Sequence, residues 1–318
     1  MRHVFIFRSG RESRFLRQLP QMLAAYFEER GGQYQILWVS TPEEAVQAAR
    51  ESCLAARDVR LYACGGDGLL HDIVNGAAAY PHAAVGIFPD GKKKDIVGSL
   101  GEAADFRSVQ AQVEGCAVPM DLLSLELPGI DGLLYAVGHV ALGPVGMSRL
   151  RRAGAPELPD ITVEVDAKGA WRFPCFFALC ANIPCWNGRR CLGWAAPDDG
   201  NAAYVLLPAG SRLYQLTAWE KFLAGRAKEM ETARCGLCQQ VTWQFESPVS
   251  IQVDGRDYAA DRVRIQIAPR KIRFIRPGLA GSRLEEGKTE GRMAFSPAPR
   301  RRQPTAMRTA RKKAAEER

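Results

Sequence analysis

Apolar and polar residues alternate between two periods along the first hundred positions. Residues 1–7, 34–39, 59–62 and 84–88 form short apolar runs of the kind found in β-strands. Between them lie longer segments in which apolar residues recur every three or four positions, as in the stretch from Phe15 to Phe27. This order of strand and helix predicts an α/β fold with a doubly wound parallel sheet, in which ligands bind at the carboxyl ends of the strands.

Two helix boundaries follow from a few residues each. Gly31 and Gly32 end the first predicted helix, because glycine is favoured just past a helix C-terminus. Thr41 begins a capping box that continues with Pro42, Glu43 and Glu44, and it opens a second predicted helix through about Ala56.

The pattern changes at Met120. Strand-like segments then follow one another, separated by Gly, Pro and Asp turns, with one helical interval from about Arg212 to Gly225. The strand-like segments are residues 120–127, 133–140, 161–165, 170–181 and 202–207. We therefore expect an α/β nucleotide-binding domain over residues 1–119 and an antiparallel, sandwich-like β-rich domain over residues 120–280.

The last 38 residues differ from the rest in composition. Residues 281–318 carry Gly, Pro, Ser, Arg and Lys with few large apolar side chains, so we predict that they are disordered. They hold eleven basic and five acidic residues, which is +6 of the total net charge of +8. Basic runs at 300–302 and 311–313 would suit an anionic membrane surface or a nucleic acid. Because the body carries no nucleic-acid-binding motif, we expect the membrane and no nucleic acid.

Nine cysteines, an odd number scattered along the chain, do not form the pattern of a disulfide framework. Cys235 and Cys238 make a single Cys-x-x-Cys, which fits either a zinc site or buried apolar thiols. The second pair that a zinc site usually needs is absent from the sequence, so we favour buried thiols. With no long apolar run, the expectation is a soluble cytoplasmic protein in a reducing compartment.

The most specific motif lies between the third predicted strand and the helix after it. Gly65, Gly66 and Gly68 surround Asp67, so the backbone can take unusual dihedral angles and its amides can approach a phosphate closely. The helix N-terminus adds partial positive charge. An acid among anions points to a divalent metal or a base for an attacking hydroxyl. A glycine-rich turn with a capping Asp is the simpler alternative.

Residues 65–76 resemble the nucleotide loop of the diacylglycerol kinase catalytic-domain family, which includes bacterial lipid kinases and sphingosine kinases. The family pattern is Gly-Gly-Asp-Gly-Thr followed by an apolar helix with Asn-Gly, and Leu69 replaces the Thr as it does in sphingosine kinases. Weaker motifs extend the resemblance over about residues 1–278. It implies an enzyme that uses ATP and Mg²⁺ to phosphorylate a hydroxyl of diacylglycerol or a related lipid, working peripherally at the membrane.

Two nucleotide-binding motifs of the family are altered here. Asn-Pro-x-x-Gly after the first strand is replaced by residues 7–11, in which Arg8, Ser9 and Arg11 either bind phosphate or are solvated residues of a basic turn. Pro-x-Gly-Thr-x-Asn-Asp becomes residues 89–95, with lysines where Thr and Asn would be; these lysines either bind an anion or form a solvated face. The residues expected to bind nucleotide are Gly65, Gly66, Asp67, Gly68, Gly91, Lys92, Lys94 and Asp95.

Two further acidic motifs follow from the resemblance. Asp198 and Asp199 would lie near a structural Mg²⁺, although an Asp-Asp-Gly hairpin turn explains them equally well. Asp254 matches the Asp of the family's Val-Asp-Gly-Glu and, with Asp67, is a candidate catalytic residue, here as general base. The Glu is replaced by Arg256, which would reverse the local field; an Asp-Gly hairpin turn is again the alternative.

Two other functions remain open at this stage. The departures at Arg8, Lys92, Lys94 and Arg256 would suit a nucleotide- or lipid-binding regulatory protein that has lost turnover. A soluble acceptor would suit another kinase with a Gly-Gly-Asp-Gly loop, such as the NAD kinase or phosphofructokinase groups. The sequence identifies neither the lipid nor the oligomeric state.

Overall fold

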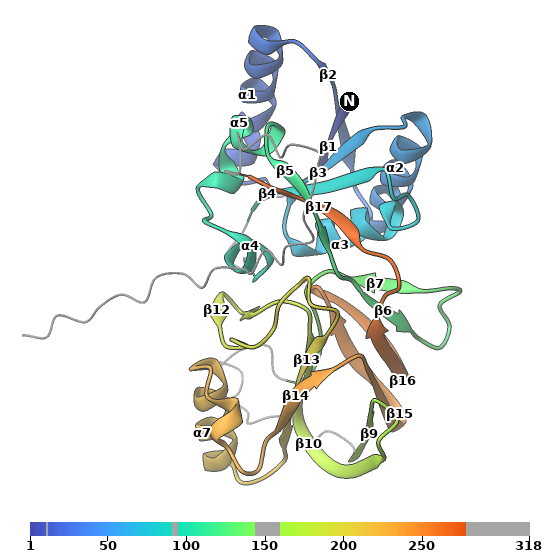
Figure 1. Cartoon of the computed structure of the whole chain (residues 1–318), viewed down its shortest axis with the longest axis vertical. Coiled ribbons are helices and arrows are strands. Elements are labelled where there is room, and N and C mark those ends of the chain that lie inside the picture. The colour runs from blue at the N-terminus through green and yellow to red at the C-terminus, as the bar shows by residue number, and fades with distance from the viewer. Residues whose placement is uncertain (11, 91–94, 144–159, 278–318) are drawn as a thin grey trace, which may run out of the picture. The chain divides into compact units, whose positions relative to one another are not determined.

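The alternating strands and helices of the N-terminal region form a six-stranded sheet in the computed structural model, which describes residues 1–10, 12–90, 95–143 and 160–277 (Figure 1). The strand order is β2-β1-β3-β4-β17-β5; β2, β1, β3, β4 and β17 run parallel and β5 is antiparallel. The strands are β1 (Arg2–Arg8), β2 (Gln33–Val39), β3 (Val59–Gly65), β4 (Ala83–Pro89), β5 (Cys116–Met120) and β17 (Ile272–Arg276). The predicted doubly wound α/β fold is confirmed.

Helices cover both faces of this sheet. The helix α1 packs against α5, and α2 packs against α3 on the opposite face (Figure 1). The helical segments are α1 (Arg14–Arg30), α2 (Pro42–Ala55), α3 (Asp67–Ala77), α4 (Asp95–Leu100), η1 (Asp105–Arg107) and α5 (Val109–Val113).

Both predicted helix boundaries are confirmed. The N–H of Gly31 bonds the carbonyl of Phe27, and Gly31 has a φ of +71°, which favours glycine. Thr41 caps α2 by accepting the N–H of Glu44. The Glu44 carboxylate returns to the N–H of Ser40, one residue before the position that a capping box usually reaches.

The strand β17 comes from the far end of the chain and lies between β4 and β5. Its parallel pairing with β4 was not anticipated, because a five-residue apolar run carries no signal for a distant partner. The chain therefore leaves the first sheet after β5 and returns to it after the second sheet is complete. The predicted domain boundary near residue 119 stays a prediction.

The second region is antiparallel and β-rich, as predicted. Its nine strands form one hydrogen-bonded sheet with the order β14-β13-β10-β8-β15-β16-β6-β7, in which β9 pairs with β10 and β15. The strands are β6 (Leu123–Glu126), β7 (Leu134–Ala136), β8 (His139–Leu142), β9 (Asp160–Val165), β10 (Ala170–Ala181), β13 (Ala202–Pro208), β14 (Arg234–Cys238), β15 (Gln240–Val253) and β16 (Arg256–Ile267). Residues 133–140, which read as one strand, divide into β7 and β8.

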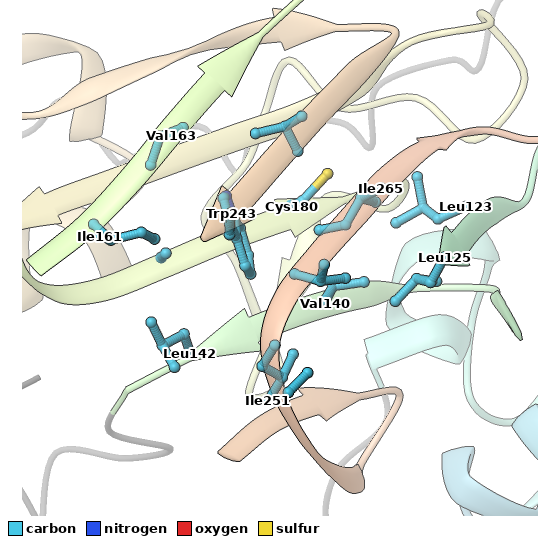
Figure 2. Packing of buried hydrophobic residues seen from close by; sticks show 14 of the residues in the cluster. Leu123, Leu125, Val140, Leu142, Ile161, Val163, Cys180, Trp243, Ile251 and Ile265 are labelled. Carbon is cyan, nitrogen blue, oxygen red and sulfur yellow. The ribbon is translucent and has the colours of Figure 1, made fainter. Parts of the chain in front are cut away.

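All nine strands contribute side chains to one buried cluster, so the sheet curves around its own apolar face (Figure 2). Trp243 of β15 is fully buried within it. A second cluster fills the space between the sheet and α7 (Arg212–Leu223), where Phe177 contacts Trp219 edge to face at 4.8 Å. The remaining elements are the short 3-10 helix η2 (Ala227–Glu229) and the hairpin β11 (Cys185–Trp186) with β12 (Arg189–Arg190).

All nine cysteines are free, and seven of them are buried. Burial raises the pKa of the Cys64 thiol well above its ordinary value, which keeps it protonated. The side chains of Cys180 and Cys238 lie close enough to interact, and this contact with burial raises the pKa of Cys180. The part of the chain that the structure describes contains no helix long and apolar enough to cross a membrane.

Candidate active site

The glycine loop lies at the end of β3, where Gly66 is the N-cap of α3 and Asp67 is its first residue. Gly66 has a φ of −90°, which any residue can adopt. Space is tight at one of the glycines: a Cβ at Gly65 would lie 2.9 Å from the Leu69 side chain, whereas a Cβ at Gly66 would meet nothing closer than 3.8 Å. The unusual dihedral angles expected for this loop are therefore absent from its glycines. The expectation that a phosphate can approach the loop amides closely stays a prediction.

A cavity of about 320 Å³ opens beside this loop. It is lined by Gly66, Asp67, Gly68, Asp90, Asp95, His139, Trp186, Asn187, Gln252, Asp254 and Gly255. The structure thus brings together the glycine loop, Asp95 and Asp254, which are up to 188 positions apart in the chain. Gly91, Lys92 and Lys94 lie outside the described residues, and Asp198 and Asp199 do not line the cavity.

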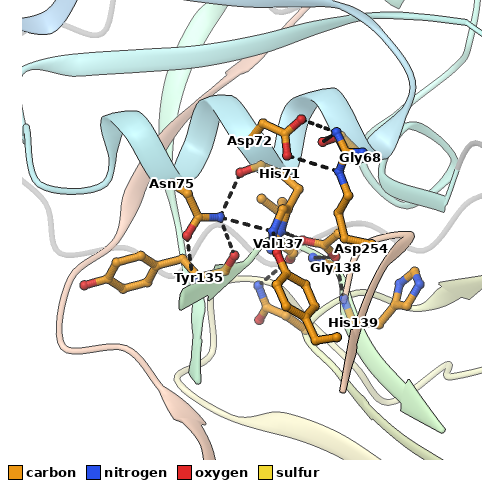
Figure 3. Close-up of polar contacts among 12 residues, drawn as sticks. Gly68, His71, Asp72, Asn75, Tyr135, Val137, Gly138, His139 and Asp254 are labelled. Carbon is orange, nitrogen blue, oxygen red and sulfur yellow. Dashed lines mark hydrogen bonds and ion pairs between the residues drawn. The ribbon is translucent and has the colours of Figure 1, made fainter. Parts of the chain in front are cut away.

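Asp254 is both a turn residue and a cavity residue. Asp254 and Gly255 have φ values of 46° and 85° and connect β15 to β16, so the expected Asp-Gly hairpin turn is present. The carboxylate accepts the N–H groups of Val137 (2.7 Å), Gly138 (2.9 Å) and His139 (2.9 Å) (Figure 3). It is 1% exposed, and these donors leave it little room to take a proton.

The pKa of Asp254 reflects two opposed influences. Burial alone would raise it, but the hydrogen bond and charge of His71, at 3.4 Å, together with the amide of His139 bring the pKa below its ordinary value of 3.8. The carboxylate is therefore ionised at neutral pH and is bound by the turn between β7 and β8.

Asp95 builds another wall of the cavity. It is buried at the start of α4, and its carboxylate accepts the N–H groups of Asn187 (3.0 Å) and Gly188 (2.6 Å). Asn187 has a φ of 50° and lies in the turn between β11 and β12. Asp95 therefore stabilises this turn. Asp95 thus positions Trp186 and Asn187 at the cavity.

Three side chains on one face of α3 contact the β-rich region (Figure 3). Asn75 pairs with the backbone of Tyr135 in β7 like a short piece of strand, accepting its N–H at 2.8 Å and donating to its carbonyl at 2.9 Å. The Nε2 atom of His71 lies 3.0 Å from the hydroxyl of Tyr258. Asp72 pairs with Arg256.

Arg256 pairs with a carboxylate on α3 and does not line the cavity. Its guanidinium reaches α3, where Nε donates to Oδ1 of Asp72 at 3.1 Å and Nη2 donates to Oδ2. Arg8 also approaches Asp72, at 3.5 Å. Burial raises the pKa of Asp72 in spite of both arginines, which lower it.

The pair Asp198 and Asp199 forms a turn. Asp199 accepts the N–H of Asn201 at 2.9 Å, and the pKa of Asp198 is raised by burial and by the nearby charge of Asp121. The ammonium of Lys271 lies 2.8 Å from Asp121 and 3.4 Å from the carbonyl of Asp198. Across the described ranges, no group of three or more His, Cys, Asp or Glu residues is arranged to hold a metal ion. The metal site at this pair stays a prediction.

Four cavity residues are not among the site residues expected from the sequence: His139, Trp186, Asn187 and Gln252. His139 and Trp186 pack edge to face, with ring centroids 4.5 Å apart. Both lie in strands whose apolar pattern describes burial only, so their place at the cavity depends on pairing with distant strands.

Comparison with known proteins relates the chain to one family. Residues 3–125 match the family model "Diacylglycerol kinase catalytic domain". The chain is 31% identical to a diacylglycerol kinase of Bacillus subtilis (strain 168) over 117 residues, which are 36% of this chain and 38% of that protein. The match to this curated relative therefore spans less than half of its length.

The fold extends further than the sequence similarity. A crystal structure of a candidate diacylglycerol kinase from Bacillus anthracis str. Sterne is similar with a TM-score of 0.69 and 14% identity, over 88% of this chain and 98% of that one. Another crystal structure of a diacylglycerol kinase from the same strain is similar with a TM-score of 0.66 and the same identity and coverage.

Proposed function

We propose that this chain, of which residues 3–125 match the family model "Diacylglycerol kinase catalytic domain", is a lipid kinase that transfers the γ-phosphoryl group of ATP to a hydroxyl of diacylglycerol or a related lipid. The observation that carries the proposal is the cavity in which the glycine loop at the start of α3 faces the Asp254–Gly255 turn. Phosphoryl transfer depends mainly on positioning and on charge stabilisation, which such a cavity can supply.

The donor side of the cavity would hold the phosphates of ATP. The amides of Gly66 to Gly68 lie at the N-terminus of α3, where anions are favoured and no side chain intervenes at the glycines. Lys92 and Lys94, which directly precede α4 in the sequence, would add positive charge. This assignment keeps the sequence-based prediction that these residues bind nucleotide.

Magnesium fits the carboxylates that line the cavity. Mg²⁺ is commonly held by one or two carboxylates together with substrate phosphates and does not need a cage made by the protein alone. Asp67 and Asp90 both line the cavity and would hold it, with Asp90 also accepting the N–H of Ser13 at 3.1 Å. Asp95 and Asp254 each accept two or more backbone N–H groups, so we assign them to holding turns. When bound, the ion would neutralise charge on the phosphates.

The two predicted catalytic aspartates receive different roles. Asp67 would act on the acceptor hydroxyl or through Mg²⁺, because it lines the cavity at the glycine loop of residues 65–68, which we call the phosphate loop in this proposal. Asp254 is held by three amides and His71, so we assign it to positioning the turn between β7 and β8, in place of the general-base role expected from the sequence.

The acceptor would approach from a membrane surface. The basic residues of 281–318 would attract anionic lipid at about 1 kcal/mol for each residue near the surface. The proposed enzyme would therefore be cytoplasmic and would work at the membrane surface, with a lipid as substrate and no nucleic-acid partner.

The proposal is tested by transfer of label from γ-labelled ATP, with Mg²⁺, into the organic phase of an assay containing diacylglycerol, sphingosine and a bacterial lipid extract. Labelled lipid is expected from the unaltered chain and from Asp261→Asn, an exposed control on β16, and not from Asp67→Asn. Folding of each variant is checked by circular dichroism.

Three results would contradict the proposal in whole or in part. Transfer by Asp67→Asn at the normal rate would remove Asp67 from the mechanism. A folded protein that binds ATP but labels no lipid would instead be the regulatory binding protein, and label on a soluble acceptor would indicate a different kinase group.

A further inference from the structure

Helix α3 carries a polar stripe that connects the phosphate loop to the β-rich region. Its members, Gly68, His71, Asp72 and Asn75, have the spacing of one helix face, and we call them the α3 stripe. Each contacts a residue outside the helix: Gly68 and Asp72 contact Arg256, His71 contacts Asp254 and Tyr258, and Asn75 contacts Tyr135. Two of these contacts lead to Arg256, so this residue connects to the α3 stripe most extensively.

The contact between Arg256 and Asp72 is a two-point ion pair. Nε and Nη2 of the guanidinium each donate to a different carboxylate oxygen, the geometry in which Arg recognises a carboxylate most specifically (Figure 3). The Asp72 side chain is 4% exposed and that of Arg256 is 25% exposed, so water screens the pair little.

Arg256 also touches the phosphate loop itself. Its Nη2 lies 3.4 Å from the carbonyl oxygen of Gly68, and a Cβ at Gly68 would lie 3.4 Å from its Nε. The guanidinium thus lies in van der Waals reach of the Gly68 backbone. In the chain, Arg256 directly follows the Asp254–Gly255 turn, which forms the opposite side of the cavity.

We propose that Arg256 is a positioning residue: its ion pair with Asp72 and its contact with Gly68 hold the Asp254–Gly255 turn at a set distance from the phosphate loop. This inference rests on the proposed phosphoryl transfer, in which donor and acceptor sides of the cavity must be aligned. The side chain itself lies against α3 and makes no contribution to the cavity lining.

The same geometry explains why a cation occupies this position. An acid at position 256 would lie against the buried carboxylate of Asp72, and two like charges at that distance repel. Asp72 and Arg256 thus form a complementary pair, to which Arg8 adds a second, more distant cation.

The test compares Arg256→Lys, Arg256→Met and Asp72→Asn with the double variant Asp72→Asn/Arg256→Met. Arg172 provides a matched control, because its Nε and Nη2 also contact acids, Asp160 and Glu246, on sheet strands outside the cavity. For each variant, kcat of lipid phosphorylation and Kd for ATP are measured separately.

If Arg256 positions the turn, Arg256→Met lowers kcat by about tenfold to a hundredfold, the cost of a small misalignment of reacting groups, while the Kd for ATP stays near that of the unaltered chain. Arg256→Lys recovers only part of the rate, because an ammonium cannot contact both oxygens in the same geometry. The double variant is no slower than the slower single variant. Arg172→Met leaves kcat unchanged.

The proposal is overturned if kcat of Arg256→Met is unchanged, or if the two single effects multiply in the double variant. A large rise in Kd for ATP at unchanged kcat would make Arg256 a nucleotide ligand instead.

Hydrogen–deuterium exchange keeps this inference separate from the proposed function. Amides of residues 253–258 are expected to exchange faster in Arg256→Met and at the normal rate in Arg172→Met. Should the unaltered chain phosphorylate no lipid, the proposed function fails, yet faster exchange would still support the coupling of the turn to α3. Unchanged exchange would overturn it.

Discussion

Asp67 and Asp254 show how one residue type acquires different properties from its surroundings. Asp67 lies at the first position of α3 beside glycines, where a carboxylate meets the positive end of the helix and an open cavity. Asp254 lies in a turn and is enclosed by amide donors and an imidazole. The first arrangement suits chemistry on a ligand, and the second suits structure.

Replacement of Asp254 by Asn should therefore destabilise the protein as well as lower the rate of the proposed reaction. The amide group of Asn cannot accept all three N–H donors, and a buried donor left unpaired costs about 1–3 kcal/mol. Urea unfolding measures this loss, with Asp257→Asn, an exposed neighbour on β16, as control. Equal unfolding free energies for the two variants would contradict the structural role.

His3 predicts a pH dependence of stability. Burial, the charge of Arg60 and the N-terminal ammonium lower its pKa from 6.5 to about 4, and its Nδ1 lies 3.0 Å from the Tyr62 hydroxyl. Because the unfolded chain binds the proton more readily, the free energy of unfolding should fall as pH decreases from about 6.5 to about 4.

The contribution of His3 is isolated with His3→Gln, which cannot titrate. We expect the unfolding free energy, measured with urea at several pH values, to change less steeply with pH in this variant between about pH 6.5 and about pH 4. The difference in slope corresponds to at most one bound proton. Parallel slopes for the two proteins would show that His3 does not titrate differently on folding.

At the level of elements, α2 and α3 are packed so closely that one glycine determines their separation. A Cβ at Gly76 would lie 2.3 Å from the Val46 carbonyl oxygen and 2.8 Å from Cβ of Ala49. Because α3 carries the glycine loop at its start, this contact sets the position of the loop relative to the sheet. The Asn-Gly end of the motif thus has a packing role distinct from its start.

Gly76→Ala should destabilise the protein by about 1–3 kcal/mol, because backbone must move to admit the methyl group. The matched control is Gly98→Ala in α4, where the added Cβ would meet Cys185 Sγ at an ordinary 3.6 Å. There the usual helix preference for Ala should make the change neutral or stabilising by about 0.5–1 kcal/mol. Thermal unfolding compares the two; the same sign for both would contradict the packing argument.

At the level of the whole molecule, the two sheets are connected by more than one crossing of the chain. The chain passes from β5 into β6 and returns from β16 into β17, which completes the first sheet between β4 and β5. The α3 stripe adds side-chain contacts to the second sheet, including the two hydrogen bonds between Asn75 and the backbone of Tyr135 in β7. Residues Met1–Ser282 accordingly form one compact unit of contacts.

Removal of the basic segment after Ser282 should therefore separate membrane binding from folding. We expect the shortened chain to keep its unfolding temperature and to lose most of its binding to vesicles that contain anionic lipid, in a salt-dependent manner. Vesicle sedimentation at two salt concentrations measures this, with vesicles of neutral lipid as control. Unchanged binding by the shortened chain would move the membrane contact to the body.

Local periodicity and turn chemistry predicted a large part of this protein. The alternation of strands and helices, the capping of α2 by Thr41, the end of α1 at Gly31 and the Asp254–Gly255 turn all depend on neighbours within a few residues, which the sequence contains directly. The motif at Gly65 to Gly76 likewise placed a glycine-rich loop at a strand-to-helix junction, because its glycines and its acid are consecutive.

Tertiary structure decided what depends on residues far apart in the chain. The pairing of β17 with β4, the arrival of His139 and Trp186 at the cavity, and the partner of Arg256 all join segments separated by about 50 to 190 positions. From the sequence alone, Asp254 was either a candidate general base or part of an Asp-Gly hairpin turn, and Arg256 was a cation with no identified partner. Only the fold supplies the amides that occupy Asp254 and the buried Asp72 that pairs with Arg256, because charge and hydrogen bonding act through space.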